Sequence, residues 1–200
     1  MLLFPIKPEF QKGIFTHFNA AFDMKLFLAV LGGRSRGCHI EQHDVRWVVG
    51  EQIEDGIPEL IRQWNGLRKG LHLDSYRTIE RVDGHRIEVI GERHPPAGAN
   101  DPRLWFVNVG GYSPNSMAEQ HQFDVVVAHT AAAAKASAKR SWLRGMQKVH
   151  KDDLHDVRQD PSLDDLLQIT GNGQWSLRIS PIDGGDDPAP VPDWFGYRLL

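Results

Sequence analysis

The sequence predicts an α+β protein made of two tandem units, each with the order strand-strand-helix-strand-strand. Three observations support this. Gly32-Gly33 and Glu41-Gln42-His43 return as Gly110-Gly111 and Glu119-Gln120-His121 with the same spacing. Short apolar runs lie on either side of one stretch of helical periodicity in each half. Glycine-rich turns separate these runs. Such units predict β-grasp-like rolls, in which one helix packs across a mixed sheet.

The two units correspond without a gap across two strands, a helix and the start of a third strand. Corresponding residues lie 78 positions apart, because 110 − 32 and 152 − 74 both give 78. The pairs include Val49/Val127, Trp64/Trp142, His72/His150 and Asp74/Asp152. A single repeated Gly-Gly is a common coincidence, but a long ungapped set is not. The sequence therefore contains an internal duplication.

The first unit begins with a buried strand over residues 25–31, followed by a second strand over 41–49. A helix follows, and Pro58 predicts either a kink in it or a start near Ile57. A third strand over 71–81 leads to the hairpin turn Asp83-Gly84 and a fourth strand over 86–90. In the second unit the same pattern predicts strands over 103–109, 119–128, 148–157 and 174–179, with a helix over 131–144.

These elements set the predicted boundaries. Residues 1–23 form an N-terminal extension, 24–93 the first unit, 94–102 a linker and 103–180 the second unit. A short helix is expected to be inserted in the second unit near 162–169, where the register of the repeat breaks. Residues 181–200 form a C-terminal tail. Its aromatic cluster at 194–197 is expected to dock on the protein itself.

Composition excludes several classes of protein. The chain has 200 residues, a net charge of -3 and one cysteine, Cys38. Such a charge implies no partner by bulk electrostatics, so nucleic acid is not the expected ligand. One cysteine cannot form an internal disulfide, and no run approaches the roughly 20 apolar residues of a membrane span. We expect a cytoplasmic protein without a membrane anchor.

The strings K-L-F-L-A-V-L-G-G, H-I-E-Q-H-D-V and F-V-N-V-G-G-Y carry a family resemblance. The chain resembles a bacterial family known as domain of unknown function 1543, whose members have one or two copies of the unit. The resemblance covers roughly residues 24–180. It implies a small cytoplasmic bacterial protein and brings no activity or catalytic roles with it.

Paired Glu, His and Asp residues are the candidate site. Glu41 with His43, and His72 with Asp74, are i, i+2 pairs, so each pair points to one side of its strand. Imidazole and carboxylate suit acid-base chemistry or a divalent metal such as zinc, iron or manganese. The second unit repeats the set as Glu119, His121, His150 and Asp152.

A structural role explains the same residues. Glu41 and His43 share a strand face with Val45 and Trp47, where a histidine is commonly held by hydrogen bonds to a carboxylate or a loop carbonyl. Duplication agrees with this interpretation, because each unit must fold. The glycines are then explained by a turn with positive φ. Cys38 has Ser116 as its counterpart, which argues against a nucleophile required in both units.

The leading hypothesis is a non-catalytic binding or protein-interaction module with no cofactor. The alternative is a metal-dependent or acid-base enzyme that uses the Glu-x-His and His-x-Asp pairs. The sequence names no partner, but it allows a homodimer formed through sheet edges or helix faces. Lys135, Lys139 and Arg140 on the second helix oppose Glu54 and Glu59 on the first, so these helices could face each other within a dimer or between units.

Overall fold

The computed structural model describes residues 23–91, 98, 100–112, 115–141, 148–149, 166–184 and 187–200. Nearly all of the predicted extension and most of the predicted linker lie outside them. The elements are β1 (Lys25–Gly33), β2 (Gln42–Gly50), α1 (Ile53–Gln63), β3 (His72–Thr78), β4 (Arg81–Val82), β5 (His85–Gly91), β6 (Arg103–Tyr112), β7 (Gln120–Ala128), α2 (Ala131–Ser141), β8 (Lys148–Val149), β9 (Leu166–Gln168), β10 (Trp175–Pro181) and β11 (Trp194–Leu199). The α+β class is confirmed.

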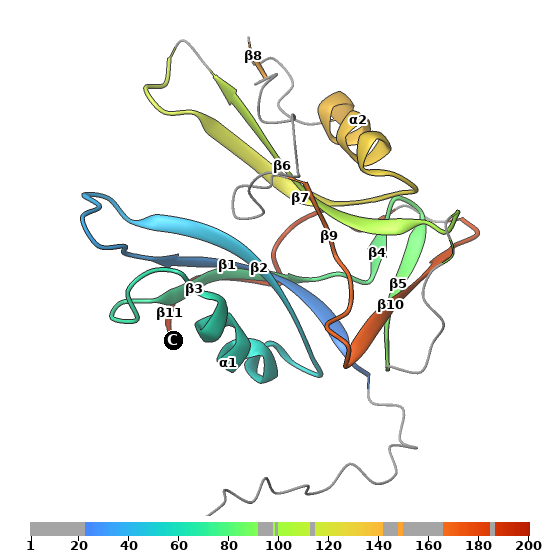
Figure 1. Cartoon of the computed structure of the whole chain (residues 1–200), viewed down its shortest axis with the longest axis horizontal. Coiled ribbons are helices and arrows are strands. Elements are labelled where there is room, and N and C mark those ends of the chain that lie inside the picture. Colours follow the sequence, from blue (N-terminus) through green and yellow to red (C-terminus); the bar gives the residue numbers. More distant parts are fainter. Residues whose placement is uncertain are drawn as a thin grey trace, which may run out of the picture.

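The described elements stack in four layers, with a helix outside each of two packed sheets (Figure 1). Alternation along β1 builds the first two interfaces: Phe27 and Leu31 pack with α1, whereas Leu26 and Leu28 face the sheet of β6 and β7. On the far side, α2 packs on the sheet of β6 and β7 through Ala134 and other small residues. The two helices therefore lie on opposite outer faces and do not face each other between units.

The first sheet has the strand order β2-β1-β3-β11, and neighbouring strands are antiparallel throughout. The β-grasp arrangement is not confirmed. Instead of adding to the sheet of its own unit, β5 pairs with β4 and with β10 from the second half of the chain. β11, from the end of the chain, takes the sheet edge beside β3. These strand pairings join segments that are far apart in the sequence, so local periodicity could not predict them.

The two leading hairpins have the same register. Lys25 pairs with Gly50 in β1–β2, and Arg103 pairs with Ala128 in β6–β7. Each pair in the second hairpin lies 78 residues after its counterpart. The two hairpins are therefore equivalent in strand pairing as well as in sequence.

Helix α1 begins at Ile53 instead of near Ile57, and Pro58 lies inside it. Asp55 explains the earlier start, because its Oδ2 accepts hydrogen bonds from the backbone N–H groups of Glu51 and Gln52 at 3.1 and 3.0 Å. A carboxylate that bonds free N–H groups stabilises a helix N-terminus. Pro58 removes one hydrogen bond of the helix, and the packing of the apolar face outweighs that loss.

The short helix predicted near 162–169 is not found over its described part. Leu166–Gln168 form strand β9, which pairs with Trp105, Phe106 and Val107 of β6. The open edge of β6 supplies backbone partners for this segment, and Leu166 is buried beneath α2. A tertiary partner thus overrides the helical pattern of the sequence.

The C-terminal aromatic cluster docks on the protein, as predicted, but it does so as strand β11. The backbone N–H of Asp193 donates to the Tyr76 carbonyl, and that of Leu200 donates to the Leu71 carbonyl, each at 2.9 Å. Trp194 stacks on Tyr76, with ring centroids 6.3 Å apart. Among the described residues, no helix has the length and apolar character needed to cross a membrane.

Candidate functional site

Four of the predicted site residues meet at one end of the first sheet. Gly32 of the central strand β1 lies opposite His43 of β2 on one side and opposite His72 of β3 on the other. All three positions face away from α1, because Leu31 and Leu73 pack toward that helix. The pairing thus brings both sequence pairs, Glu41/His43 and His72/Asp74, to the same face.

A β-bulge in β3 aims the side chain of Asp74. Val30 pairs with Ser75 and Leu31 pairs with Leu73, which leaves Asp74 as the extra residue on β3. A bulge bends the strand and redirects the side chain of the extra residue. Here the carboxylate reaches two imidazole rings at once, one on its own strand and one on β2.

His72 is the buried centre of this group, with its side chain only 3% exposed. Its Nδ1 lies 2.9 Å from the Gly70 carbonyl oxygen, which can only accept, so Nδ1 carries a proton. Its Nε2 lies 3.0 Å from Glu41 Oε1 and 3.1 Å from Asp74 Oδ1. Nε2 is therefore held between two carboxylate oxygens, one from β3 and one from the residue just before β2.

His43 has the opposite character, since its side chain is 56% exposed. Its Nε2 lies 3.2 Å from Asp74 Oδ2. Asp74 therefore bridges the two rings, with one oxygen toward each. The result is a chain from Glu41 through His72 and Asp74 to an imidazole open to solvent.

The glycine pair serves close packing and not a turn. Neither Gly32 nor Gly33 has positive φ, and both belong to β1. A Cβ on Gly32 would lie 2.8 Å from Cε1 of His72 and closer still to Nε2, and one on Gly33 would lie 2.8 Å from Cζ2 of Trp64. The expectation of a positive-φ turn is wrong. The glycines are needed because an imidazole and an indole occupy the space of their side chains.

The second copy reproduces part of the arrangement. His121 Nε2 lies 3.7 Å from Glu119 Oε2, and its Nδ1 lies 3.2 Å from the side-chain nitrogen of Asn108. A Cβ on Gly110 would lie 2.8 Å from Cδ of Glu119. His150 and Asp152 lie outside the described residues. In this unit a glutamate, instead of a histidine, fills the space above the glycine.

Three contacts join the four side chains of the first unit in the order Glu41, His72, Asp74 and His43. Within the part of the chain that the structure describes, no group of three or more His, Cys, Asp or Glu side chains is arranged to hold a metal ion. Cys38 is a half-buried free thiol in the loop after β1. The divalent-metal hypothesis therefore stays a prediction.

Sequence reasoning missed one member of the site, Tyr197. Its ring stacks on that of His72, with centroids 4.1 Å apart and planes at 29°. Tyr197 lies on β11, which covers the outer side of β3. The aromatic cluster at the end of the chain was the available signal, but nothing local in the sequence links it to His72.

Comparisons with known proteins agree with the duplicated pattern. The model of a family described as Domain of Unknown Function (DUF1543) matches the chain at residues 38–89 and again at 116–167. The crystal structure of a protein Il1583 from Idiomarina loihiensis is similar to this structure, with a TM-score of 0.64 and 31% sequence identity, over 89% of this chain and 99% of that one. No curated protein matches the chain.

Proposed function

We propose that this chain, which belongs to the domain of unknown function 1543 family and carries the family's unit twice, is a protein-interaction module that pairs with a second copy of itself. The proposed contact is the free edge of β11. The row of large apolar side chains on this strand is the observation that carries the proposal.

An edge strand presents backbone N–H and C=O groups that another strand can bond. β11 is the last strand of its sheet, and no strand among the described residues pairs with its outer side. Antiparallel pairing of one such edge with its own copy satisfies twofold symmetry. A closed dimer is therefore the simplest assembly that covers the β11 edge of each copy.

Solvent exposure on β11 supports the same contact. Phe195, Tyr197 and Leu199 are 78%, 66% and 65% exposed, although they belong to one six-residue strand. Soluble proteins usually leave large apolar residues single on the surface, and a contiguous row indicates an interaction site. Burying each aromatic side chain removes roughly 150–250 Å² from water, worth roughly 25 cal/mol per Å² of apolar area.

Sedimentation velocity over a range of protein concentrations tests the proposal. We expect the wild type to form a dimer, and Phe195→Ser with Leu199→Ser to give a folded monomer. Val191→Ser is the matched control, because Val191 is exposed just before β11 and lies outside the strand. A wild type that stays monomeric at all concentrations, or a double variant that dimerises as well as the control, would contradict the proposal.

An acid-base enzyme is the second candidate, and the open imidazole of His43 favours it. The contact of Nε2 with Asp74 places the proton of the neutral ring on that nitrogen and leaves Nδ1 as a free base. Carboxylates orient histidines in this way in many acid-base sites. The enclosed ring of His72 would then position Asp74 without touching a substrate.

Hydrolysis of para-nitrophenyl acetate and titration with zinc chloride, both on protein without a His-tag, test the second candidate. An acid-base role predicts a rate above that of His43→Ala and a smaller rate in Asp74→Asn. A metal role predicts stoichiometric zinc binding that both substitutions weaken. Equal rates in all three proteins, together with no stoichiometric zinc binding, would remove this candidate.

A further inference from the structure

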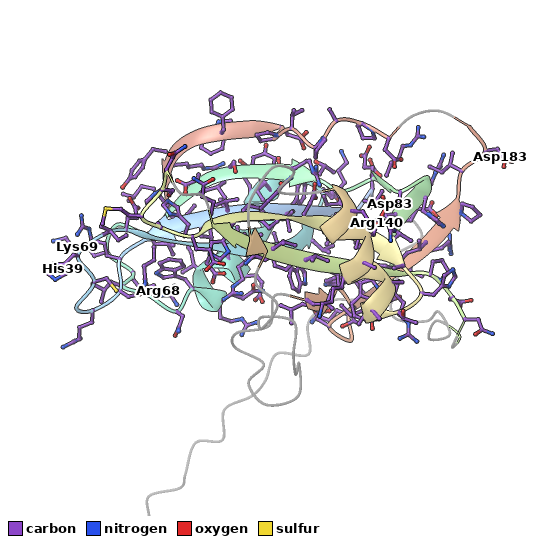
Figure 2. The ribbon with its side chains drawn as sticks, turned by 90° about the horizontal axis from the view of Figure 1, so that it is seen from above. His39, Arg68, Lys69, Asp83, Arg140 and Asp183 are labelled. Atoms are coloured by element: carbon purple, nitrogen blue, oxygen red, sulfur yellow. The ribbon has the colours of Figure 1, made fainter. Side chains whose placement is uncertain are left out.

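A strongly basic surface lies beside the Glu/His/Asp group, at the end of the first unit. Two loops form it: residues 34–40 after β1 and residues 65–70 after α1. Their cationic side chains, here called the basic loop end, are Arg34, Arg36, Arg68 and Lys69. All four are exposed. Figure 2 shows Arg68 and Lys69 close to His39 at this end of the molecule, and Asp183 at the opposite end.

The basic loop end has no internal counter-charge. Residues 34–40 read R-S-R-G-C-H-I and residues 65–70 read N-G-L-R-K-G, so neither loop contains an acidic residue. The nearest carboxylate along the chain is Glu41, whose Oε1 faces His72. Four like charges in two adjacent loops repel each other and favour a bound anion.

The two loops form one fixed platform. The backbone N–H of Leu67 donates to the Arg34 carbonyl at 2.7 Å, and the indole N–H of Trp64 donates to the Leu67 carbonyl at 3.1 Å. A Cβ on Gly66 would lie 2.7 Å from the Arg34 carbonyl oxygen, so the loops approach as closely as glycine allows. A partner that binds here would not have to order the loops first.

The internal repeat allows the four cations to be compared with the corresponding residues of the second copy. With the shared spacing of 78, the sequence counterparts of the four cations are Tyr112, Pro114, Met146 and Gln147. None of these residues is basic. Gly32, Gly33, Glu41 and His43, by contrast, return in the second unit. The segment that corresponds to residues 65–70 carries Arg144 and Lys148 at other positions, so the set of four cations belongs to the first unit alone.

We propose that the basic loop end docks an acidic, leucine-containing segment of a partner protein. Two exposed apolar side chains, Ile40 and Leu67, lie among the cations and would contact the apolar residues of such a segment. Neither loop has a Phe, Tyr or Trp ring on which a nucleobase could stack, and the imidazole of His39 is the one exposed ring in them. The net charge of -3 also disfavours a long polyanion that extends past this end. A protein segment therefore fits better than a nucleic acid.

Fluorescence anisotropy tests this with three labelled probes: a short peptide of alternating glutamate and leucine, its lysine-leucine counterpart, and a single-stranded DNA. The test variant is Arg34→Gln with Arg68→Gln, one charge from each loop. The matched control is Arg86→Gln with Arg140→Gln, which removes the same charge from exposed positions on β5 and α2. Thermal unfolding checks that both variants remain folded.

We expect the glutamate-leucine peptide alone to bind, with an affinity that falls roughly tenfold in the test variant, is unchanged in the control variant and weakens with salt. No binding, or equal binding by both variants, would overturn the proposal. Tighter binding of the DNA, lost in the test variant, would assign the surface to nucleic acid and overturn the class of partner. The β11 variants should bind the peptide normally, so this test is separate from that of the dimer.

Discussion

Gly32 and His72 lie directly opposite each other across the β1–β3 pair, and the imidazole ring occupies the space where a side chain on Gly32 would be. The glycine of the repeated motif and the histidine forty positions later are therefore one structural unit. This relationship links the opening strand of the repeat to the Glu/His/Asp group. The role of the glycine can therefore be tested by measuring the free energy of unfolding of variants.

Gly32→Ala is expected to destabilise the protein by about 1–3 kcal/mol, because the new Cβ overlaps the ring of His72. Gly91→Ala is the control, since no atom lies within 4 Å of its Cβ position. Its free energy of unfolding should change by less than about 1 kcal/mol. Urea unfolding measures both. The cost of Gly32→Ala should shrink in a His72→Ala background, and strictly additive costs would show that the two residues do not compete for space.

The two histidines should differ sharply in their contribution to stability. His72→Ala leaves the carboxylates of Glu41 and Asp74 facing each other and removes a buried ring, so we expect a loss of about 2–4 kcal/mol. His43→Ala removes an exposed ring with one carboxylate contact, and its cost should stay below about 1 kcal/mol. Similar losses in urea unfolding would argue against a buried structural role for His72.

Local patterns predicted the hairpins and the convergence of the site. Period-two alternation placed Glu41 and His43 on the face of Val45 and Trp47, and the core between the sheets contains both apolar residues. The structural role was predicted for His43, whose side chain is 56% exposed, whereas His72 is the ring that lies between a loop carbonyl and carboxylates. The strand faces could be predicted because they follow from neighbouring residues alone.

The remaining features depend on contacts between distant segments. Asp74 reaches both rings only because of a bulge in β3, and no local signal marks it. Tyr197 covers His72 because β11 pairs with the edge of β3 and not with another sheet edge. The pairing of β5 with β10, in a sheet separate from that of β1, β2 and β3, has the same origin. Which strands pair depends on how the whole core is assembled. A local pattern of residues does not determine this.

The ion pair between Arg77 of β3 and Asp124 of β7 should couple the two halves of the chain. Both side chains are about four-fifths buried, and the Asp124 carboxylate also accepts from the Val125 N–H at 2.7 Å. A double-mutant cycle of Arg77→Ala and Asp124→Ala should give a coupling energy of about 1–2 kcal/mol. The exposed pair Glu59–Arg62 on α1 is the control. Its coupling should be much smaller, because water and salt screen an exposed pair, and equal couplings would contradict the bridging role.

The pair Arg198–Glu54 should give β11 a pH-dependent attachment to α1. Arg198 Nη1 lies 2.6 Å from Glu54 Oε1. The hydrogen bond from Arg198 lowers the pKa of Glu54 below its ordinary value of 4.5. A lowered pKa in the folded state stabilises the protein above the unfolded value, and this contribution disappears as pH falls through the folded value. Because both side chains are more than one-third exposed, Arg198→Ala should cost less than about 1 kcal/mol at neutral pH.

The difference between Arg198→Ala and the wild type should therefore shrink toward zero in acid and in high salt. Urea unfolding at neutral pH and below the folded pKa of Glu54 measures it. Arg86→Ala, from an exposed position on β5, supplies the control. A difference that stays constant or grows in acid would mean that Arg198 stabilises β11 through packing of its aliphatic stem, since packing does not titrate. The attachment of the proposed contact strand would then be independent of pH.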